Sequence, residues 1–95
     1  MTLNQLATRY IASTETVLRE IQVMEASQNI EEKDVRRIVD HVKAYLEDAK
    51  YYKDKKRFEV SLASVAYCEG LLDALRMLGA VKFEWPEKAE RKREE

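Results

Sequence analysis

The chain has 95 residues, with 17 lysines and arginines against 18 aspartates and glutamates, and a formal net charge of −1. This length suits one hydrophobic core, and the balanced charge excludes a general electrostatic attraction to nucleic acid or anionic membranes. Only two glycines and one proline occur, whereas 45% of the residues are hydrophobic and 37% are charged. Such a composition is typical of long helices with short connections, so we expect an all-α fold.

Cysteine usage and hydropathy exclude several further classes of protein. A single cysteine, Cys68, rules out an intramolecular disulfide and the multi-cysteine type of structural zinc site. The N-terminal residues do not resemble a signal peptide, and no stretch is apolar enough to span a membrane. We therefore predict a cytoplasmic protein with no membrane association and no cofactor. The abundance of Glu, Lys and Arg resembles that of heat-adapted proteins.

Two amphipathic segments come first in the chain. Apolar residues at steps of three, four or seven predict a helix over about residues 3–26, which begins at a capping box formed by Thr2 and Gln5. A second helix is predicted over about 31–53. Its apolar stripe is Val35, Ile38, Val42, Tyr45, Ala49 and Tyr52. We interpret this stripe as bundle core, although its heptad spacing would also fit an intermolecular coiled coil.

Apolar residues are absent around 54–57, which predicts a tight turn and a helical hairpin with a third helix over about 57–78. This helix has two apolar strips and should contact two neighbours. One strip contains the small residues Ala66, Gly70 and Ala74. Because glycine within a helix costs about 1 kcal/mol relative to alanine, we expect another backbone to approach closely there. The first or second helix is the expected neighbour, with a dimer partner as the alternative.

Gly79 is a natural C-terminal cap for the third helix. After it, Val81, Phe83 and Trp85 alternate with charged residues, which predicts a short extended segment that packs over the open end of the bundle. Residues 87–95 are almost all charged and predict a disordered tail. The expected fold is thus one domain over residues 1–86, an antiparallel three-helix bundle with a short extended C-terminal segment and a charged tail.

No motif for catalysis, phosphate binding or paired metal ligation occurs in the sequence. His41 is the only histidine and has no second ligand at helical spacing. Cys68 lies on an apolar strip, where we expect a core residue and not a nucleophile. We therefore predict no catalytic residues, no metal site and no enzymatic activity.

Two polar clusters are candidate binding sites. In the predicted hairpin, Asp48, Tyr67 and Asp73 form a carboxylate and tyrosine cluster that would suit a cation or a polar ligand. The alternative is that these acids satisfy arginines and tyrosine hydroxyls at the rim of the core. At the hairpin tip, basic residues beside two tyrosines would suit single-stranded nucleic acid, or would only keep a helix end soluble. The basic residues are Lys53, Lys55, Lys56 and Arg57.

Two segments of the hairpin, residues 45–52 and 67–74 followed by Leu78 and Gly79, resemble a small, mainly archaeal family catalogued as domain of unknown function 357. The family pattern at the second segment is approximately Tyr-Ala-His-Gly-Trp-Leu-Asp-Ala. Tyr67, Gly70, Leu72, Asp73 and Ala74 match it, whereas Cys68, Glu69 and Leu71 replace Ala, His and Trp. The resemblance implies a compact helical domain and no particular activity, and the missing histidine argues against an acid–base or metal role at Glu69.

These observations favour a non-enzymatic protein–protein interaction or scaffold module, with a homodimer as one form of it. Its contact surface would be either the small-residue strip of the third helix or the segment that contains Phe83 and Trp85. The alternatives are a nucleic-acid-associated module that uses the hairpin tip and a small-ligand or metal-binding protein built on the carboxylate and tyrosine cluster.

Overall fold

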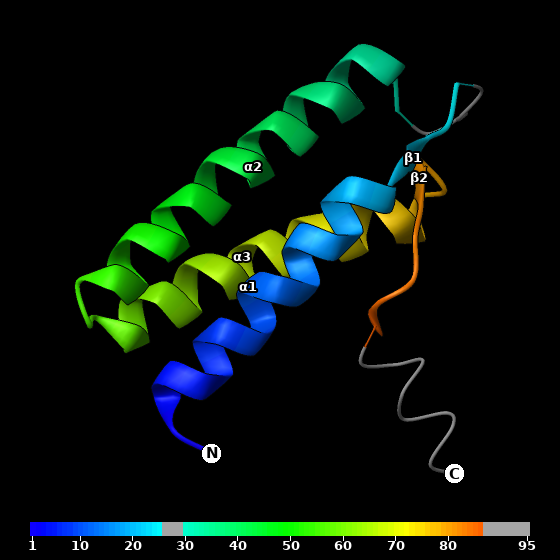
Figure 1. Cartoon of the computed structure of the whole chain (residues 1–95). Helices are drawn as coiled ribbons and strands as arrows, with labels where there is room; N and C mark the ends of the chain where they lie inside the picture. Colours follow the sequence, from blue (N-terminus) through cyan, green and yellow to red (C-terminus); the bar gives the residue numbers. More distant parts are fainter. Residues whose placement is uncertain (26–29, 87–95) are drawn as a thin grey trace, which may run out of the picture.

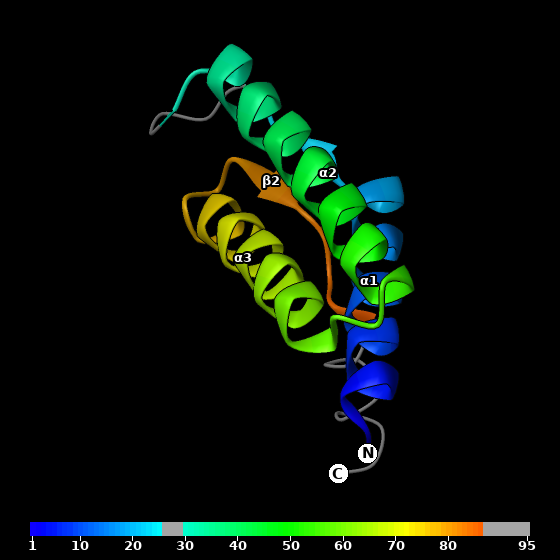
Figure 2. The same ribbon diagram turned by 90° about the vertical axis from the view of Figure 1, so that its left-hand side faces the viewer.

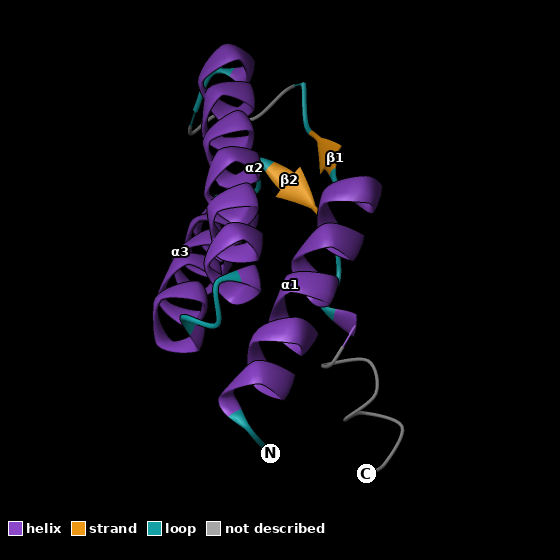
Figure 3. Cartoon of the chain, turned by 60° about the vertical axis from the view of Figure 1, so that its left-hand side comes forward, coloured by secondary structure: helices purple, strands orange, loops and turns teal. Residues whose placement is uncertain are grey.

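The structure, a computed structural model, describes residues 1–25 and 30–86. Three helices, α1 (Leu3–Glu20), α2 (Glu32–Asp54) and α3 (Phe58–Met77), run antiparallel in chain order (Figure 1). Two short strands, β1 (Gln22–Val23) and β2 (Val81–Lys82), pair near the end of the bundle where α1 and α3 finish (Figure 3). The predicted three-helix bundle is confirmed, and the predicted tail at 87–95 lies outside the described residues. Among the described residues, no helix has the length and hydropathy needed to cross a membrane.

The first helix begins as predicted but is shorter than predicted. The Gln5 backbone N–H donates to Thr2 Oγ1 at 3.1 Å, and the Thr2 N–H donates to Gln5 Oε1 at 2.9 Å, which completes the capping box. The helix was expected to reach residue 26 but ends at Glu20, because Ile21 adopts an extended conformation. From there the backbone amides and carbonyls bond to the C-terminal segment and no longer to the preceding turn.

The two strands close the end of the bundle. They pair antiparallel, with Gln22 opposite Lys82 and Val23 opposite Val81, and the Met24 N–H donates to the Ala80 carbonyl at 2.9 Å. Before β2, Gly79 has a φ of +74° and the Ala80 N–H donates to the Leu75 carbonyl, so α3 ends at a glycine cap as predicted. The extended segment after Gly79 is confirmed, whereas its pairing partner β1 was not predicted.

The core lies between the three helices, and the segment after β2 passes between α1 and α3 (Figure 2). Its main cluster consists of Ile11, Val17, Val42, Leu46, Ala49, Val65, Cys68, Leu72 and Trp85. The predicted stripe of α2 was partly wrong. Val39 and Leu46 are buried in place of Tyr45 and Tyr52. At 3.6 residues per turn, Val39 and Leu46 lie on the same side of α2 as Val35 and Val42 and therefore face the core.

Helices α2 and α3 approach each other closely where their buried residues are small. The Ser61 hydroxyl donates to the Ala49 carbonyl at 2.7 Å, and the Cys68 thiol donates to the Val42 carbonyl at 3.5 Å. All four residues are buried. A side chain can bond to the backbone of the neighbouring helix only where the side chains at the contact are short. This line of small residues therefore sets the distance between the axes of α2 and α3.

The predicted close approach of α1 or α2 at Gly70 was wrong, whereas the alternative, a dimer partner, stays a prediction. Ala66, Gly70 and Ala74 are exposed, and a Cβ atom added to Gly70 would meet nothing within 4 Å. The reason is helical phase, because these residues lie on the side of α3 opposite its buried stripe of Val65, Cys68 and Leu72.

Replacing Gly70 with alanine is therefore expected to raise the free energy of unfolding by about 0.5–1 kcal/mol, since the methyl group meets open space and alanine favours the helix. Urea denaturation followed by circular dichroism measures this change. The matched control is Gly79→Ala, which places a side chain at positive φ and should lower stability by about 1 kcal/mol. A Gly70→Ala protein less stable than the wild type would contradict the exposed position of this residue.

Candidate functional site

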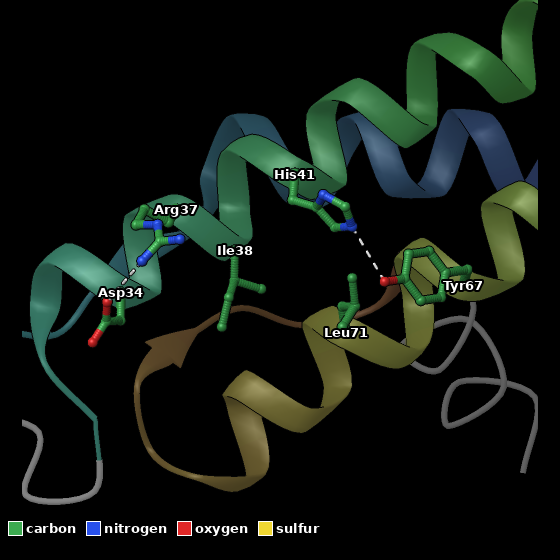
Figure 4. Close-up of a pocket in the computed structure, with 6 residues that line it drawn as sticks. All are labelled: Asp34, Arg37, Ile38, His41, Tyr67 and Leu71. Atoms are coloured by element: carbon green, nitrogen blue, oxygen red, sulfur yellow. Dashed lines mark hydrogen bonds and ion pairs between the residues drawn. The ribbon is translucent and has the colours of Figure 1, made fainter.

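A second stripe of residues on the α2–α3 hairpin faces away from α1. On α2 it follows steps of three and four residues, and on α3 it follows the same spacing, which keeps each set on one helical face. We call this surface the outer face. It consists of Ile38, His41 and Tyr45 from α2, of Ala63, Tyr67, Leu71 and Ala74 from α3, and of Leu78 directly after α3. In Figure 4, Ile38 and His41 point toward Tyr67 and Leu71, and α1 passes behind α2.

Three aromatic rings join α2 to α3 at the centre of the outer face. His41 Nε2 lies 3.2 Å from the Tyr67 hydroxyl oxygen, within hydrogen-bonding distance (Figure 4). The Tyr45 ring packs against both, with its centroid 4.6 Å from that of His41 and 4.8 Å from that of Tyr67. These tilted contacts have the geometry of favourable aromatic pairs. The link between His41 and Tyr67 was not predicted from the sequence.

A groove of about 420 Å³ lies beside these rings, between α2 and α3. Ile38 and Leu71 form its apolar part, and His41 and Tyr67 border it at one end. At the other end Arg37 Nη1 lies 3.5 Å from Asp34 Oδ1 in an exposed ion pair. Large apolar and aromatic groups with a few charges at the margin are typical of a surface that binds another protein chain.

The exposed side of α3, which overlaps with the outer face, carries little charge. Between Glu59 near its N-terminus and Met77 at its end, the exposed residues are Ala63, Ala66, Tyr67, Gly70 and Ala74, and none is charged. In a chain of which 37% is charged, an exposed helix side of this composition is unusual. The side chains of Met77 and Leu78 extend the uncharged surface at the end of the helix.

The structure gives Asp73 a structural role. Its Oδ1 accepts a hydrogen bond from Trp85 Nε1 at 2.7 Å and another from Arg76 at 3.2 Å. The Arg76 guanidinium lies 5.4 Å from the centroid of the Phe83 ring, which contacts the Trp85 ring edge to face. Trp85 is only 6% exposed and Phe83 is half-buried, so this C-terminal segment belongs to the core of its own chain and presents little surface.

The predicted cluster of Asp48, Tyr67 and Asp73 is therefore divided between different surroundings. Tyr67 lies on the outer face, whereas Asp73 lies about 120° around α3 from it. Asp48 is exposed on α2, one turn after Tyr45, and makes no hydrogen bond or ion pair with the other described residues. Within the described part of the chain, no group of three His, Cys, Asp or Glu side chains is placed to hold a metal ion.

The basic hairpin tip does form as a unit, but its cations already contact the tyrosines. Lys55 Nζ lies 5.6 Å from the Tyr51 ring centroid, and the Arg57 guanidinium lies 5.5 Å from that of Tyr52. Lys56 has a φ of +61° and forms the turn. Lys53 is half-buried in a groove between α1 and α2. Each tyrosine thus has one ring face occupied by a cation of the same chain.

Two titratable groups near the core have shifted pKa values. Burial raises the pKa of Cys68 to about 11, so its thiol is protonated near neutral pH and behaves as the expected core residue. Hydrogen bonds to Glu47 and Glu15 raise the pKa of Lys50. The ion pair between Lys50 and Glu15 connects α2 to α1. Neither group lies on the outer face, where the only histidine and the paired tyrosines are found.

Comparison with known proteins gives the family and nothing more specific. No curated protein and no solved structure is significantly similar to the chain. The family described as "Protein of unknown function (DUF357)" matches residues 9–81, which include all three helices in part or in full and the first residue of β2. The resemblance seen in the hairpin is thereby confirmed over most of the sequence, and the chain belongs to this family of unknown function.

Proposed function

We propose that the protein is a non-enzymatic interaction module that forms a homodimer through the outer face and acts in the cytoplasm without a cofactor. The observation that carries this proposal is the second stripe on the α2–α3 hairpin, in which the large side chains of Tyr45, Tyr67 and Leu78 are exposed. Tyrosine is enriched where proteins bind each other, because it offers a large and rigid contact area.

The size of the outer face supports a second copy as its occupant. Two adjacent helices of 23 and 20 residues, each about 30 Å long and about 10 Å apart, present roughly 600 Å² in projection. The accessible surface is larger than this flat projection, because the side chains protrude from it. A standard stable interface buries about 800 Å² per partner, which is roughly one eighth of the 6505 Å² that the molecule exposes. The side of the hairpin that carries the outer face is therefore close in size to one side of a standard interface.

Replacing Tyr67 with glutamate is expected to weaken self-association more than about 30-fold, because it places an unpaired charge at the centre of the interface. Sedimentation equilibrium from micromolar to millimolar concentration measures this effect. The matched control is Tyr51→Glu, since Tyr51 is 56% exposed against 45% for Tyr67 and does not belong to the outer face. The control should associate like the wild type.

Both variants should retain the helical circular dichroism of the wild type, because both side chains are largely exposed and surface changes alter stability little. A wild-type protein that stays monomeric up to millimolar concentration would overturn the proposal. A Tyr67→Glu protein that dimerises as tightly as the wild type would place the interface elsewhere.

A further inference from the structure

Arg37 and Asp48 hold related positions at the edge of the outer face. They are eleven residues apart on α2, which is three helical turns to within about 20°, so both lie along one edge of the helix. At about 1.5 Å per residue, Arg37 lies about 9 Å before the midpoint of His41 and Tyr45, and Asp48 lies about 8 Å after it. The two opposite charges are thus almost equally distant from the aromatic centre of the face.

Resting on the proposed function, we infer that two copies associate antiparallel about a two-fold axis at the level of His41, Tyr45 and Tyr67, which pairs Arg37 of each copy with Asp48 of the other. This axis lies in the plane of the interface, perpendicular to the helices. Rotation about it reverses the direction of α2 and keeps each edge on its own side. Arg37, which precedes the level of the axis on α2, then lies opposite Asp48 of the second copy, which follows that level by a similar distance. The same contact forms twice, and a closed, symmetric dimer results.

The electrostatic state of the two side chains fits this pairing. Asp48 is exposed and makes no hydrogen bond or ion pair within the described chain, so its carboxylate is available to a partner. Within the part of the chain that the structure describes, Arg37 forms one ion pair, with Asp34 at 3.5 Å, and its side chain is 83% exposed. Such an exposed ion pair contributes little to stability, so Arg37 can leave Asp34 and pair with a carboxylate of a second copy at little cost. Opposite charges that flank an apolar helical seam set partner orientation in the same way in coiled coils.

The same axis also gives a favourable match of side-chain sizes on α3. Tyr67 lies at the level of the axis, so residues four positions before and after it face each other in the dimer. Exposed Ala63 of one copy then meets half-buried Leu71 of the other, and small against large allows the two surfaces to interdigitate. The two Tyr67 rings meet near the axis, where aromatic pairs are favourable.

A charge-swap experiment tests this arrangement, with sedimentation equilibrium at low salt as the measurement. Arg37→Asp alone and Asp48→Arg alone should each weaken the homodimer about tenfold, because each turns two attractive contacts into two repulsive ones. The double variant Arg37→Asp/Asp48→Arg should recover the wild-type affinity. An equimolar mixture of the two single variants should also recover it, as a heterodimer with both ion pairs restored.

The matched control is Arg36→Asp, which removes the neighbouring arginine and its pair with Glu32 on another side of α2. Its affinity should equal that of the wild type, and 1 M salt should reduce the difference between the single variants and the wild type. A dimer that tolerates both single variants, or single variants that do not recover when mixed, would overturn the antiparallel arrangement and leave self-association in place. A wild-type monomer would instead overturn the proposed function itself.

Discussion

Replacing Trp85 with alanine is expected to lower the free energy of unfolding by about 3–5 kcal/mol. The indole is 6% exposed and belongs to the main core cluster, which contains residues of all three helices. Its removal leaves a large cavity and also takes the Nε1 donor away from Asp73. Urea denaturation followed by circular dichroism measures the loss, because the substitution removes the only tryptophan and with it the fluorescence signal.

The control is Trp85→Phe, which keeps most of the buried ring but cannot donate to Asp73. Arg76 still satisfies that carboxylate, so the expected loss is only about 1–2 kcal/mol. The difference between the two variants separates packing from hydrogen bonding. If Trp85→Ala were as stable as the wild type, the C-terminal segment would not belong to the core.

Replacing Ala49 with leucine is expected to lower the free energy of unfolding by about 3 kcal/mol, the upper part of the usual range for overpacking. Ala49 is fully buried, and the Ser61 hydroxyl lies 2.7 Å from its carbonyl oxygen, so a larger side chain must push α3 away from α2. The loss should appear as a lower urea midpoint with an unchanged slope, since the core stays folded until the transition.

An alanine on the opposite side of the hairpin provides the comparison. Ala66→Leu places the same side chain on the exposed side of α3 and should change stability by no more than about 0.5 kcal/mol. Equal losses in the two variants would contradict the close contact at Ala49 and Ser61 and would point to a general intolerance of larger residues.

The helices were predictable from the sequence because their signals are local. Apolar periodicity, the Thr2 capping box and the Gly79 cap each depend on residues a few positions apart. The end of α1 was not predictable in this way. Ile21 leaves the helix because residues 22–24 bond to residues 80–82, and no local motif records a pairing between such distant segments. Two-residue strands are also too short to show an alternating pattern.

The stripe of α2 shows why helix phase is harder to predict than helix existence. Steps of three and four residues lead from Val35 through Ile38 to Val42 and Tyr45, but the buried stripe passes through Val39 and Leu46 instead. Both paths fit helical spacing, because α2 carries apolar residues on two adjacent sides. The residues Ile38, His41 and Tyr45, which also follow steps of three and four, mark the outer face and not the core.

The sequence allowed single residues of the candidate site to be identified, but not their arrangement in space. The exposed strip of Ala66, Gly70 and Ala74 was identified, but its burial against another helix of the same chain was not borne out. Asp73 was seen as a candidate ligand residue because a sequence does not show that an indole twelve residues later takes its carboxylate. The contact between His41 and Tyr67 joins side chains from two helices, so it depends on the register of the hairpin.

The pairing of β1 with β2 has a consequence for the order of folding. Neighbouring parts of the chain form the α2–α3 hairpin across a turn of a few residues, whereas the strand pair joins Gln22 to Lys82, about sixty residues apart. Closing that longer loop costs roughly 2–3 kcal/mol more in chain entropy, and only four strand residues are gained directly. We expect the hairpin to form first and to serve as the template on which α1 and the C-terminal segment dock, so that Trp85 reaches its native position last.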